Sequence, residues 1–343
     1  METRCRRPTG RAVADRELIW VDIGAASARD VAALHPRTAR LVDSFPGGNL
    51  TTVAAAARRH SPPTKLAAGL PSNARKQLAA FTDNGFVTVA DLAEIDDRTA
   101  ELSGRVSNLA DLVDMAWIAV HGGNQPHRRR GVDTTAVPRA DVEVDIDMEN
   151  AFDGATYLWG LHITNRSGKR FGFLDGYFPV VDWSPMTPRV EIEVFLQFWA
   201  RIEGLLAEAN SRRLTCKLYV WHETAELSKM RRAVALTGEV GADLMAMINA
   251  VQRSERWVDL EQEFQRVAIA PSGTGLTKIG PYAGFEWEAD DAGGEASMLW
   301  HHHAVDGDEA IRAKLLRYNE NDVAAGLAIR EWLCANELPT LPG

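Results

Sequence analysis

The clearest pattern of hydrophobic and polar positions in the chain is a strict alternation over residues 142–149. Apolar residues occupy every second position, and the positions between them are all acidic: Glu143, Asp145, Asp147 and Glu149. Side chains alternate between the two faces of a β-strand, so this pattern predicts a strand with four carboxylates on one face. The next apolar stretch, residues 155–164, is β-prone and follows a short turn, which predicts that the two strands pair within a buried sheet.

Four acids on one face fit two different environments. In the first, the strand lies at the edge of a sheet and its acidic face is solvated. In the second, the acids converge on a cation, because neighbouring carboxylates on a strand face lie roughly 7 Å apart and repel one another. The apolar neighbouring strand favours the second environment, and carboxylate oxygens suit Mg²⁺ or Mn²⁺ rather than zinc.

The residues that follow predict a regular succession of strands and helices. We expect strands over about residues 171–181 and 215–222, and helices over about 188–210, 225–237 and 308–335. Three successive strands, a crossover helix and a fourth strand imply an α/β fold with a mixed sheet, in which the first three strands are antiparallel and the fourth is parallel to the first. The acidic strand is then central. This order resembles the ribonuclease H-like architecture, a mixed sheet flanked by helices.

The first 130 residues carry weaker patterns. They predict a short strand over residues 17–23 and a helix within 28–41 that is interrupted at Pro36. From residue 71 the apolar spacing predicts short helices joined at Asn84-Gly85, with Thr88 as the N-cap of the second. This helical spacer resembles a helix-hairpin-helix element, which can present backbone amides to phosphate. A plain α-hairpin connector gives the same pattern.

The best domain boundary is the run over residues 122–131, which is rich in glycine, arginine and proline. We therefore expect a poorly defined N-terminal segment over 1–70, a small, mainly helical spacer over 71–130 and a ribonuclease H-like domain over 140–336. A basic run of this kind is typical of a solvated linker and also of a contact with a nucleic-acid backbone. The candidates for such a contact are Arg128, Arg129 and Arg130.

Composition narrows the class of protein. Hydrophobic residues make up 45% of the 343 residues and charged residues 25%, which is typical of a globular protein. No apolar run reaches membrane-spanning length and no apolar core follows the arginine-rich N-terminus, so we expect neither a membrane protein nor a secretory signal. The three cysteines are widely separated, which predicts no disulfide framework, no zinc cluster and a reducing, cytoplasmic location.

The net charge of −9 is unevenly distributed along the chain. Residues 1–130 contain 18 Lys/Arg against 14 Asp/Glu, whereas the remaining residues contain 20 against 33. An acidic second half is a poor electrostatic partner for a polyanion. If nucleic acid binds there, bound cations or local basic patches must offset the carboxylates.

Other acids stand at positions that suit a shared site. Tyr318 and Asp322 are four residues apart in the closing helix, so they face the same way. Glu226 falls in the first turn of the helix after the fourth strand, beside the acidic strand. The helix dipole alone also favours an acid at that position.

Three motifs in this order resemble those of the DEDD-type 3′-5′ exonucleases, in their tyrosine subclass: Asp147-Met-Glu149, Thr224-Ala-Glu226 and Tyr318-Asn-Glu-Asn-Asp322. Longer stretches resemble more closely the C-terminal ribonuclease H-like domain of RecB-like, YprB-type nucleases. They are Val142-Glu-Val-Asp-Ile-Asp-Met-Glu-Asn150, Tyr157-Leu-Trp-Gly160, Trp257-Val-Asp-Leu260, Gly293-Gly294 and Leu316-Arg-Tyr-Asn-Glu-Asn-Asp-Val323. The likeness covers roughly residues 140–335, and residues 70–112 are similar to the spacer that precedes this domain in the family.

The resemblance implies a hydrolase of phosphodiester bonds that uses two Mg²⁺ or Mn²⁺ ions and acts on a nucleic acid, DNA or RNA, with a single-stranded end. It implies that Tyr318 orients the attacking water. The first motif can also be phased with Asp145 as a ligand. The residues that the resemblance assigns to metal binding are Asp147, Glu149, Glu226 and Asp322.

The chain departs from the family in two respects. It carries glutamate at position 226, where the wider exonuclease group has aspartate, and the extra methylene shifts a ligand by roughly an ångström. Larger relatives carry a second nuclease domain with cysteines that hold an iron-sulfur cluster. This chain has only Cys5 in that region, so we expect no cluster and no second nuclease domain.

Each of the further candidates has both a functional and a purely structural interpretation. Lys278 follows a glycine-containing loop and could contact a phosphate, although a lone lysine is more often a surface charge. Asp259 suits a helix N-cap or a supporting role at the metal site. The three histidines from His301 to His303 point about 100° apart on a helix and do not chelate one ion together, so we expect them at the surface or behind the site.

A second class of function stays open. A ribonuclease H-like fold with an impaired metal site could serve as a module that binds nucleic acid or a protein partner. Loss of nucleotides from single strands that depends on Mg²⁺ or Mn²⁺ separates the two interpretations. A pair of carboxylates for glycoside hydrolysis, a third interpretation, would act without metal and resist EDTA.

Overall fold

A computed structural model describes residues 18–22, 50–54, 80–81, 83–86, 89–95, 104, 106, 108–238, 241–287 and 293–342. The chain forms two compact units. Unit 1 comprises residues 1–130, 268–275 and 339–343, and unit 2 comprises residues 131–267 and 276–338. The helix predicted over 28–41 and the N-cap predicted at Thr88 lie outside the described residues.

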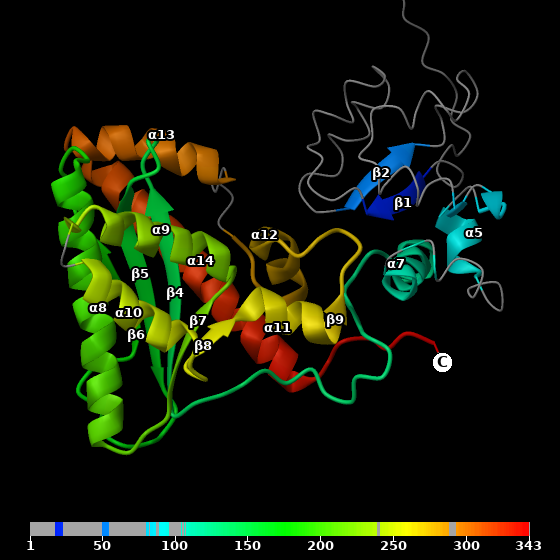
Figure 1. Ribbon diagram of the computed structural model, residues 1–343, viewed down its shortest axis with the longest axis horizontal. Helices are drawn as coiled ribbons and strands as arrows, with labels where there is room; N and C mark the ends of the chain where they lie inside the picture. Colours follow the sequence, from blue (N-terminus) through cyan, green and yellow to red (C-terminus); the bar gives the residue numbers. More distant parts are fainter. Residues whose placement is uncertain are drawn as a thin grey trace, which may run out of the picture. The chain divides into compact units, whose positions relative to one another are not determined.

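The centre of unit 2 is a mixed sheet of five described strands in the order β6-β5-β4-β7-β8 (Figure 1). Strands β4 and β5 pair antiparallel, as do β5 and β6, whereas β4 pairs parallel with β7 and β7 with β8. The predicted mixed sheet with the acidic strand at its centre is therefore confirmed. The strands are β4 (Val142–Asn150), β5 (Thr156–Asn165), β6 (Gly176–Val181), β7 (Cys216–Val220) and β8 (Trp257–Asp259).

Two strands differ from the prediction. The third strand, predicted over residues 171–181, begins at Gly176, because residues 166–175 form a loop held by side chains. At the start of that loop, Asn165 donates its backbone N–H to Asp175 Oδ1 and its side-chain amide to the Lys169 carbonyl. The fifth strand, β8, has three residues, too few to show the alternation by which a strand is predicted.

The apolar side of β4 packs against a layer of helices on one face of the sheet. Helix α8 (Pro188–Ser211) is the crossover between β6 and β7, and the Thr187 hydroxyl caps it by accepting the Val190 N–H. Its Phe198 ring stacks on Trp159 of β5 at 4.3 Å between centroids. This apolar cluster also contains residues of α9 (Glu223–Ala235) and α10 (Gly241–Gln252).

Helix α14 (Glu309–Ala335) packs against β4 and β5 on the opposite, acidic face (Figure 1). Asp308 caps it by accepting the N–H groups of Ala310 and Ile311. Because β4 alternates, the same strand supplies apolar side chains to α8–α10 and carboxylates to α14. The other helices described in unit 2 are α11 (Leu260–Val267), α12 (Leu276–Ile279), the 3₁₀ turn η4 (Gly280–Ala283) and α13 (Gly293–Val305).

The described residues of unit 1 form two small antiparallel sheets and short helices. Strand β1 (Leu18–Asp22), predicted over 17–23, pairs with β2 (Leu50–Ala54), and β3 (His127–Arg128) pairs with β9 (Ala268–Ile269). Its described helices are α5 (Val89–Ala93) and α7 (Leu109–His121), and their apolar faces share one core.

The turn before α5 matters for the expected phosphate contact. The N–H groups of Asn84 and Phe86 both donate to the Phe81 carbonyl, at 3.2 and 2.9 Å, and Gly85 adopts a φ of +83° that suits glycine. Those two amides are therefore engaged within the turn.

None of the helices in the described part of the chain combines the length and the apolar character that a bilayer crossing needs.

Candidate metal centre

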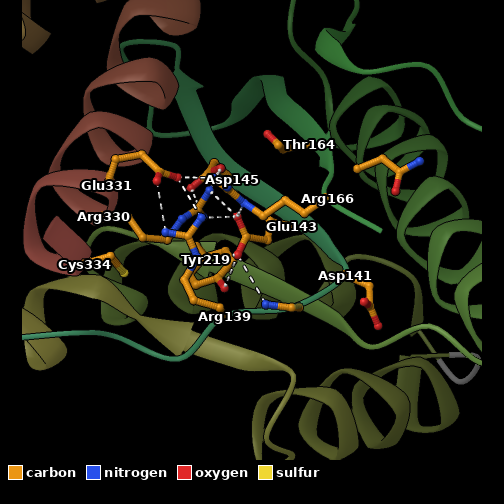
Figure 2. A network of polar contacts seen from close by, with 12 residues as sticks. Arg139, Asp141, Glu143, Asp145, Thr164, Arg166, Tyr219, Arg330, Glu331 and Cys334 are labelled. Atoms are coloured by element: carbon orange, nitrogen blue, oxygen red, sulfur yellow. Dashed lines mark hydrogen bonds and ion pairs between the residues drawn. The ribbon is translucent and has the colours of Figure 1, made fainter. Parts of the chain in front are cut away.

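The acidic face of β4 is divided into two halves, and the first half is neutralised by arginine (Figure 2). Arg330 of α14 is fully buried and makes a bidentate ion pair with Asp145, at 2.6 and 2.9 Å. Its guanidinium also lies 3.2 Å from Glu143 and over the ring of Tyr219, 3.9 Å from the centroid. Asp145, the alternative metal ligand, thus faces Arg330.

Two further arginines complete this polar network. Arg139 donates to Glu143 at 2.8 Å and to Glu331 at 2.7 Å, and Arg166 donates to Glu143 at 2.6 Å and also to Glu331. Burial alone would raise the pKa of Glu143, but the charge of Arg330 and the arginine hydrogen bonds lower it below its usual value. In this network three guanidinium groups face three carboxylates, two from β4 and Glu331 from α14, so its formal charges balance (Figure 2).

The second half of the acidic face forms a cluster with the closing helix. One oxygen each of Asp147, Glu149 and Asp322 lies within 4.8 Å of the other two. Glu149 is buried and the other two side chains are partly exposed. Three carboxylates at this separation, reachable from solvent, form a donor set for a hard divalent cation such as Mg²⁺ or Mn²⁺.

The electrostatics of this acid cluster indicate a place for positive charge. Burial, followed by the negative charges of Asp322, Glu149 and Glu226, raises the pKa of Asp147 well above its usual value. Carboxylates that repel one another in a low-dielectric site are stabilised in their ionised form by a cation. The residues present therefore fit a divalent metal.

Glu226 lies near the acid cluster but is not part of it. It sits in the first turn of α9, is buried, and its Oε2 has no hydrogen-bond partner within the described residues. Burial and the negative charges of Asp259, Glu223 and Glu261 raise its pKa to about 8. A buried carboxylate oxygen without a donor is costly, and a bound cation would satisfy it.

The tyrosine of the third motif lies beside these acids. Tyr318 is buried on α14, one turn before Asp322, and its ring contacts Trp300 of α13 edge-on at 6.3 Å between centroids. The Lys314 ammonium group lies over the Trp300 ring, 3.8 Å from the ring centroid. This places an aromatic and a cationic side chain next to Tyr318.

Sequence reasoning missed several side chains that hold the acids. Asn319 donates its amide N–H to Asp147 Oδ2 at 2.7 Å, and its carbonyl accepts the hydroxyl hydrogen of Tyr177 at 2.8 Å. The Ser297 hydroxyl donates to Glu149 at 3.0 Å, and the Trp287 indole N–H donates to Asp322 at 2.9 Å. Asn319 lies inside the third motif, but an isolated serine and a tryptophan outside the motifs gave no signal.

Asp259 takes one of its two expected roles. Its Oδ1 accepts the Gln262 N–H and so caps α11, and its Oδ2 accepts the Glu223 N–H at the start of α9. It thereby fixes the beginning of the helix that carries Glu226.

The basic candidates lie in other elements of the chain. Arg129 and Arg130 form ion pairs with Asp111 and Asp114 of α7 within unit 1, the second at 2.8 Å. Arg128 is in β3. Lys278 is in α12, where burial lowers its pKa.

The three histidines do not act as a group. His302 and His303 are exposed, whereas His301 is buried and stacks on Tyr157 at 4.1 Å between ring centroids. Within the described residues, none of them belongs to a cluster that could hold a metal ion.

Comparison with known proteins supports the fold. A family model described as RNase_H superfamily matches residues 223–334, which include Glu226, Tyr318 and Asp322. Searches of curated proteins and of solved structures gave no match. Together with the strand order of unit 2, the family match identifies a ribonuclease H-like domain in the chain.

Proposed function

We propose that this chain, through its ribonuclease H-like domain, is a metal-dependent 3′-5′ exonuclease that hydrolyses phosphodiester bonds of DNA or RNA at single-stranded ends. We propose further that it is related to the DEDD-type enzymes and to the RecB-like, YprB-type nucleases. The observation that carries the proposal is the cluster of Asp147, Glu149 and Asp322, which joins β4 to α14. The raised pKa of Asp147 adds support, because it reflects burial and negative charges that a cation would relieve.

The proposal assigns a role to each side chain. Asp147, Glu149 and Asp322 would hold divalent ions, and the unsatisfied oxygen of Glu226 would serve as a further ligand. Tyr318 orients the attacking water. When bound, two divalent ions supply Lewis acidity that lowers the pKa of a water and stabilises the leaving 3′ oxygen.

The basic side chains and the location belong to the proposal as well. Lys278 and the run Arg128 to Arg130 are proposed to contact phosphates, which would offset the acidic charge of the domain. The proposed location is the cytoplasm, which the free thiols of Cys216 and Cys334 support.

The test uses single-stranded oligonucleotides labelled at the 5′ end, incubated with Mg²⁺ or Mn²⁺. A 3′-5′ exonuclease produces a ladder of shortened labelled strands, and EDTA stops it. We expect Asp147→Asn and Asp322→Asn each to slow the reaction by on the order of 100-fold or more, because each removes a charged metal ligand.

The matched control is Asp306→Asn, which removes a carboxylate from an exposed pair with His302 at 3.6 Å. Exposed pairs of this kind contribute little to stability, so this variant should cleave as the wild type does. Cleavage that resists EDTA, or that survives in Asp147→Asn, would overturn the proposal.

One observation favours a second candidate function. Glu226 is not part of the acid cluster. Its side chain is also longer than the aspartate that the wider exonuclease group has at this position. If it does not reach the metals, the domain serves as a module that binds nucleic acid without cutting it. Binding of a single strand in Mn²⁺ that leaves the strand intact would identify this function.

A further inference from the structure

Asn319 connects a metal-binding carboxylate to a tyrosine on another strand. Its side chain is fully buried between α14 and the sheet. The amide nitrogen donates to Asp147 Oδ2 of β4 at 2.7 Å, and the amide oxygen accepts from Tyr177 of β6 at 2.8 Å. Three elements far apart in the sequence thus meet in one short series of hydrogen bonds, which we term the Tyr177–Asn319–Asp147 series.

The direction of these hydrogen bonds is fixed by chemistry. With a cation bound, the Asp147 carboxylate is ionised and only accepts hydrogen bonds, so the NH₂ group of Asn319 must face it. The amide oxygen then faces Tyr177, whose hydroxyl group can donate. Removal of the tyrosine hydroxyl would leave a buried amide oxygen without a donor and would remove the contact that holds the amide plane.

A glycine makes room for the series. Gly160 of β5 lies opposite Asp147 in the β4–β5 pair and opposite Pro179 in the β5–β6 pair. A Cβ atom at this position would lie 1.8 Å from Asn319 Oδ1 and 2.9 Å from Tyr177 Cε2. Distances this short are impossible for real atoms, so any side chain here must push Asn319 away from Asp147.

We infer that Tyr177 and Asn319 are positioning residues of the metal site: they orient the carboxylate of Asp147 toward a divalent cation. This inference rests on the proposed function, because it presumes that the acid cluster holds metal. A carboxylate that is free to rotate spends part of its time with its lone pairs turned away, whereas an amide bound to one oxygen fixes the carboxylate plane. Side chains that orient a ligand in this way typically change metal affinity by about 10–100-fold.

The experiment measures Mn²⁺ affinity directly by electron paramagnetic resonance on the full chain without nucleic acid. The test variants are Tyr177→Phe, which removes only a hydroxyl group, and Gly160→Ala, which displaces Asn319 without changing a polar group. We expect each variant to bind Mn²⁺ about tenfold more weakly or worse. In cleavage assays, kcat should fall while KM for the oligonucleotide stays close to the wild-type value.

Each test variant has a matched control in the same unit. Tyr219→Phe also removes a buried tyrosine hydroxyl, one that donates to the Pro138 carbonyl at 2.8 Å within the arginine network of Figure 2. Gly326→Ala adds a methyl group in α14 whose nearest neighbour, Leu260 Cδ1, is 3.9 Å away. We expect both controls to bind Mn²⁺ as the wild type does, even where Tyr219→Phe lowers the melting temperature as much as Tyr177→Phe.

The possible outcomes separate this inference from the proposed function. If a folded Tyr177→Phe variant binds Mn²⁺ as tightly as the wild type, the inference is overturned. Cleavage by the wild type would in that case still support the proposed function. Equal weakening in Tyr219→Phe also overturns it, since the effect would then be one of general stability. If the wild type binds Mn²⁺ but cuts no strand, and Tyr177→Phe binds more weakly, the inference stands and the nuclease proposal fails. A wild type that binds no Mn²⁺ overturns both.

Discussion

Two pairs of acids on one strand face have opposite environments. Glu143 and Asp145 face the guanidinium of Arg330, whereas Asp147 and Glu149 form a cluster with Asp322. The alternation of β4 predicted the shared face, and burial in a central strand excludes the solvated edge. The resemblance assigned Asp147 and Glu149 to the metal and left Asp145 as an alternative. The pairing of Asp145 with Arg330 could not be predicted, because Arg330 is 185 residues away and an arginine in a helix carries no sign of its partner.

Glu226 predicts an unusual pH dependence of stability in the metal-free protein. Its pKa, raised to about 8 mainly by burial, means that the folded state keeps a proton that the unfolded state releases above its ordinary pKa of 4.5. Stability therefore falls as the pH rises from about 4.5 to about 8. We expect Glu226→Gln, which cannot ionise, to be about 3 kcal/mol more stable than the wild type at pH 8 in EDTA.

Urea denaturation at pH 4.5, 6 and 8 measures this difference, which should shrink toward zero at the lowest pH. With excess Mn²⁺ at pH 8, the order should reverse, because only the wild type retains the ligand. Equal stability of the two proteins at pH 8 in EDTA would contradict the prediction.

At the scale of elements, helix α14 makes polar contacts with both halves of the acidic face of β4. Asn319, Asp322 and Arg330 recur at spacings close to the helical repeat, so they lie along one face of the helix and meet the acids of the strand. The sequence predicted the helix over residues 308–335, close to its observed limits of 309–335. It also predicted that Tyr318 and Asp322 face one way, because that follows from helical geometry alone.

The limits of sequence reasoning are clearest in short or irregular elements. Strand β6 begins later than expected because side-chain hydrogen bonds from Asn165 stabilise a loop, and an apolar stretch with glycines does not reveal them. Gly160 belongs to the motif Tyr157-Leu-Trp-Gly160, but the space that it leaves is needed by the side chain of Asn319, which is distant in the sequence. Contacts between distant segments, rather than local propensity, decide these positions.

The ion pair between Arg330 and Asp145 should anchor α14 to β4. Both side chains are buried, so Arg330→Met leaves the Asp145 carboxyl without its partner, and we expect a loss of about 3–5 kcal/mol in the free energy of unfolding. Asp145→Leu combined with Arg330→Met replaces the pair by apolar groups and should recover much of that loss.

Urea denaturation of the two single variants and the double variant forms a double-mutant cycle that isolates the pair. As a control, Arg189→Met breaks an exposed pair with Glu193 and should change stability little. A loss below about 1 kcal/mol in Arg330→Met would show that water or another group compensates Asp145.

At the scale of the whole molecule, unit 1 is built from three separate segments of the chain. Residues 268–275 and 339–343 belong to unit 1 although they lie within and after the sequence of unit 2. Strand β9 pairs with β3, Arg128 donates its backbone N–H to the Pro339 carbonyl, and Ile269 is buried in the core of α5 and α7. Neither segment could be assigned to this unit from sequence, because both are short and lie more than a hundred residues beyond their partners.

Removal of the first 130 residues should therefore expose apolar surface in the remaining chain and promote its aggregation. A fragment of residues 131–343 exposes Ile269 and leaves β9 without its partner strand. We expect this fragment to bind the dye ANS and to associate at micromolar concentration, since exposed apolar groups and free strand edges promote aggregation. Size-exclusion chromatography and ANS fluorescence beside the full chain measure this. A monomeric fragment with no dye binding would contradict the prediction.

The assembly of unit 1 from three segments limits how such a protein can evolve. A recombination event that replaced the first 130 residues would import a partner without the matching loop at 268–275 or the matching tail at 339–343. The two units are therefore unsuited to exchange as independent modules. Natural variants should instead show compensating substitutions between α7 and these two segments, as the parts of one inherited core.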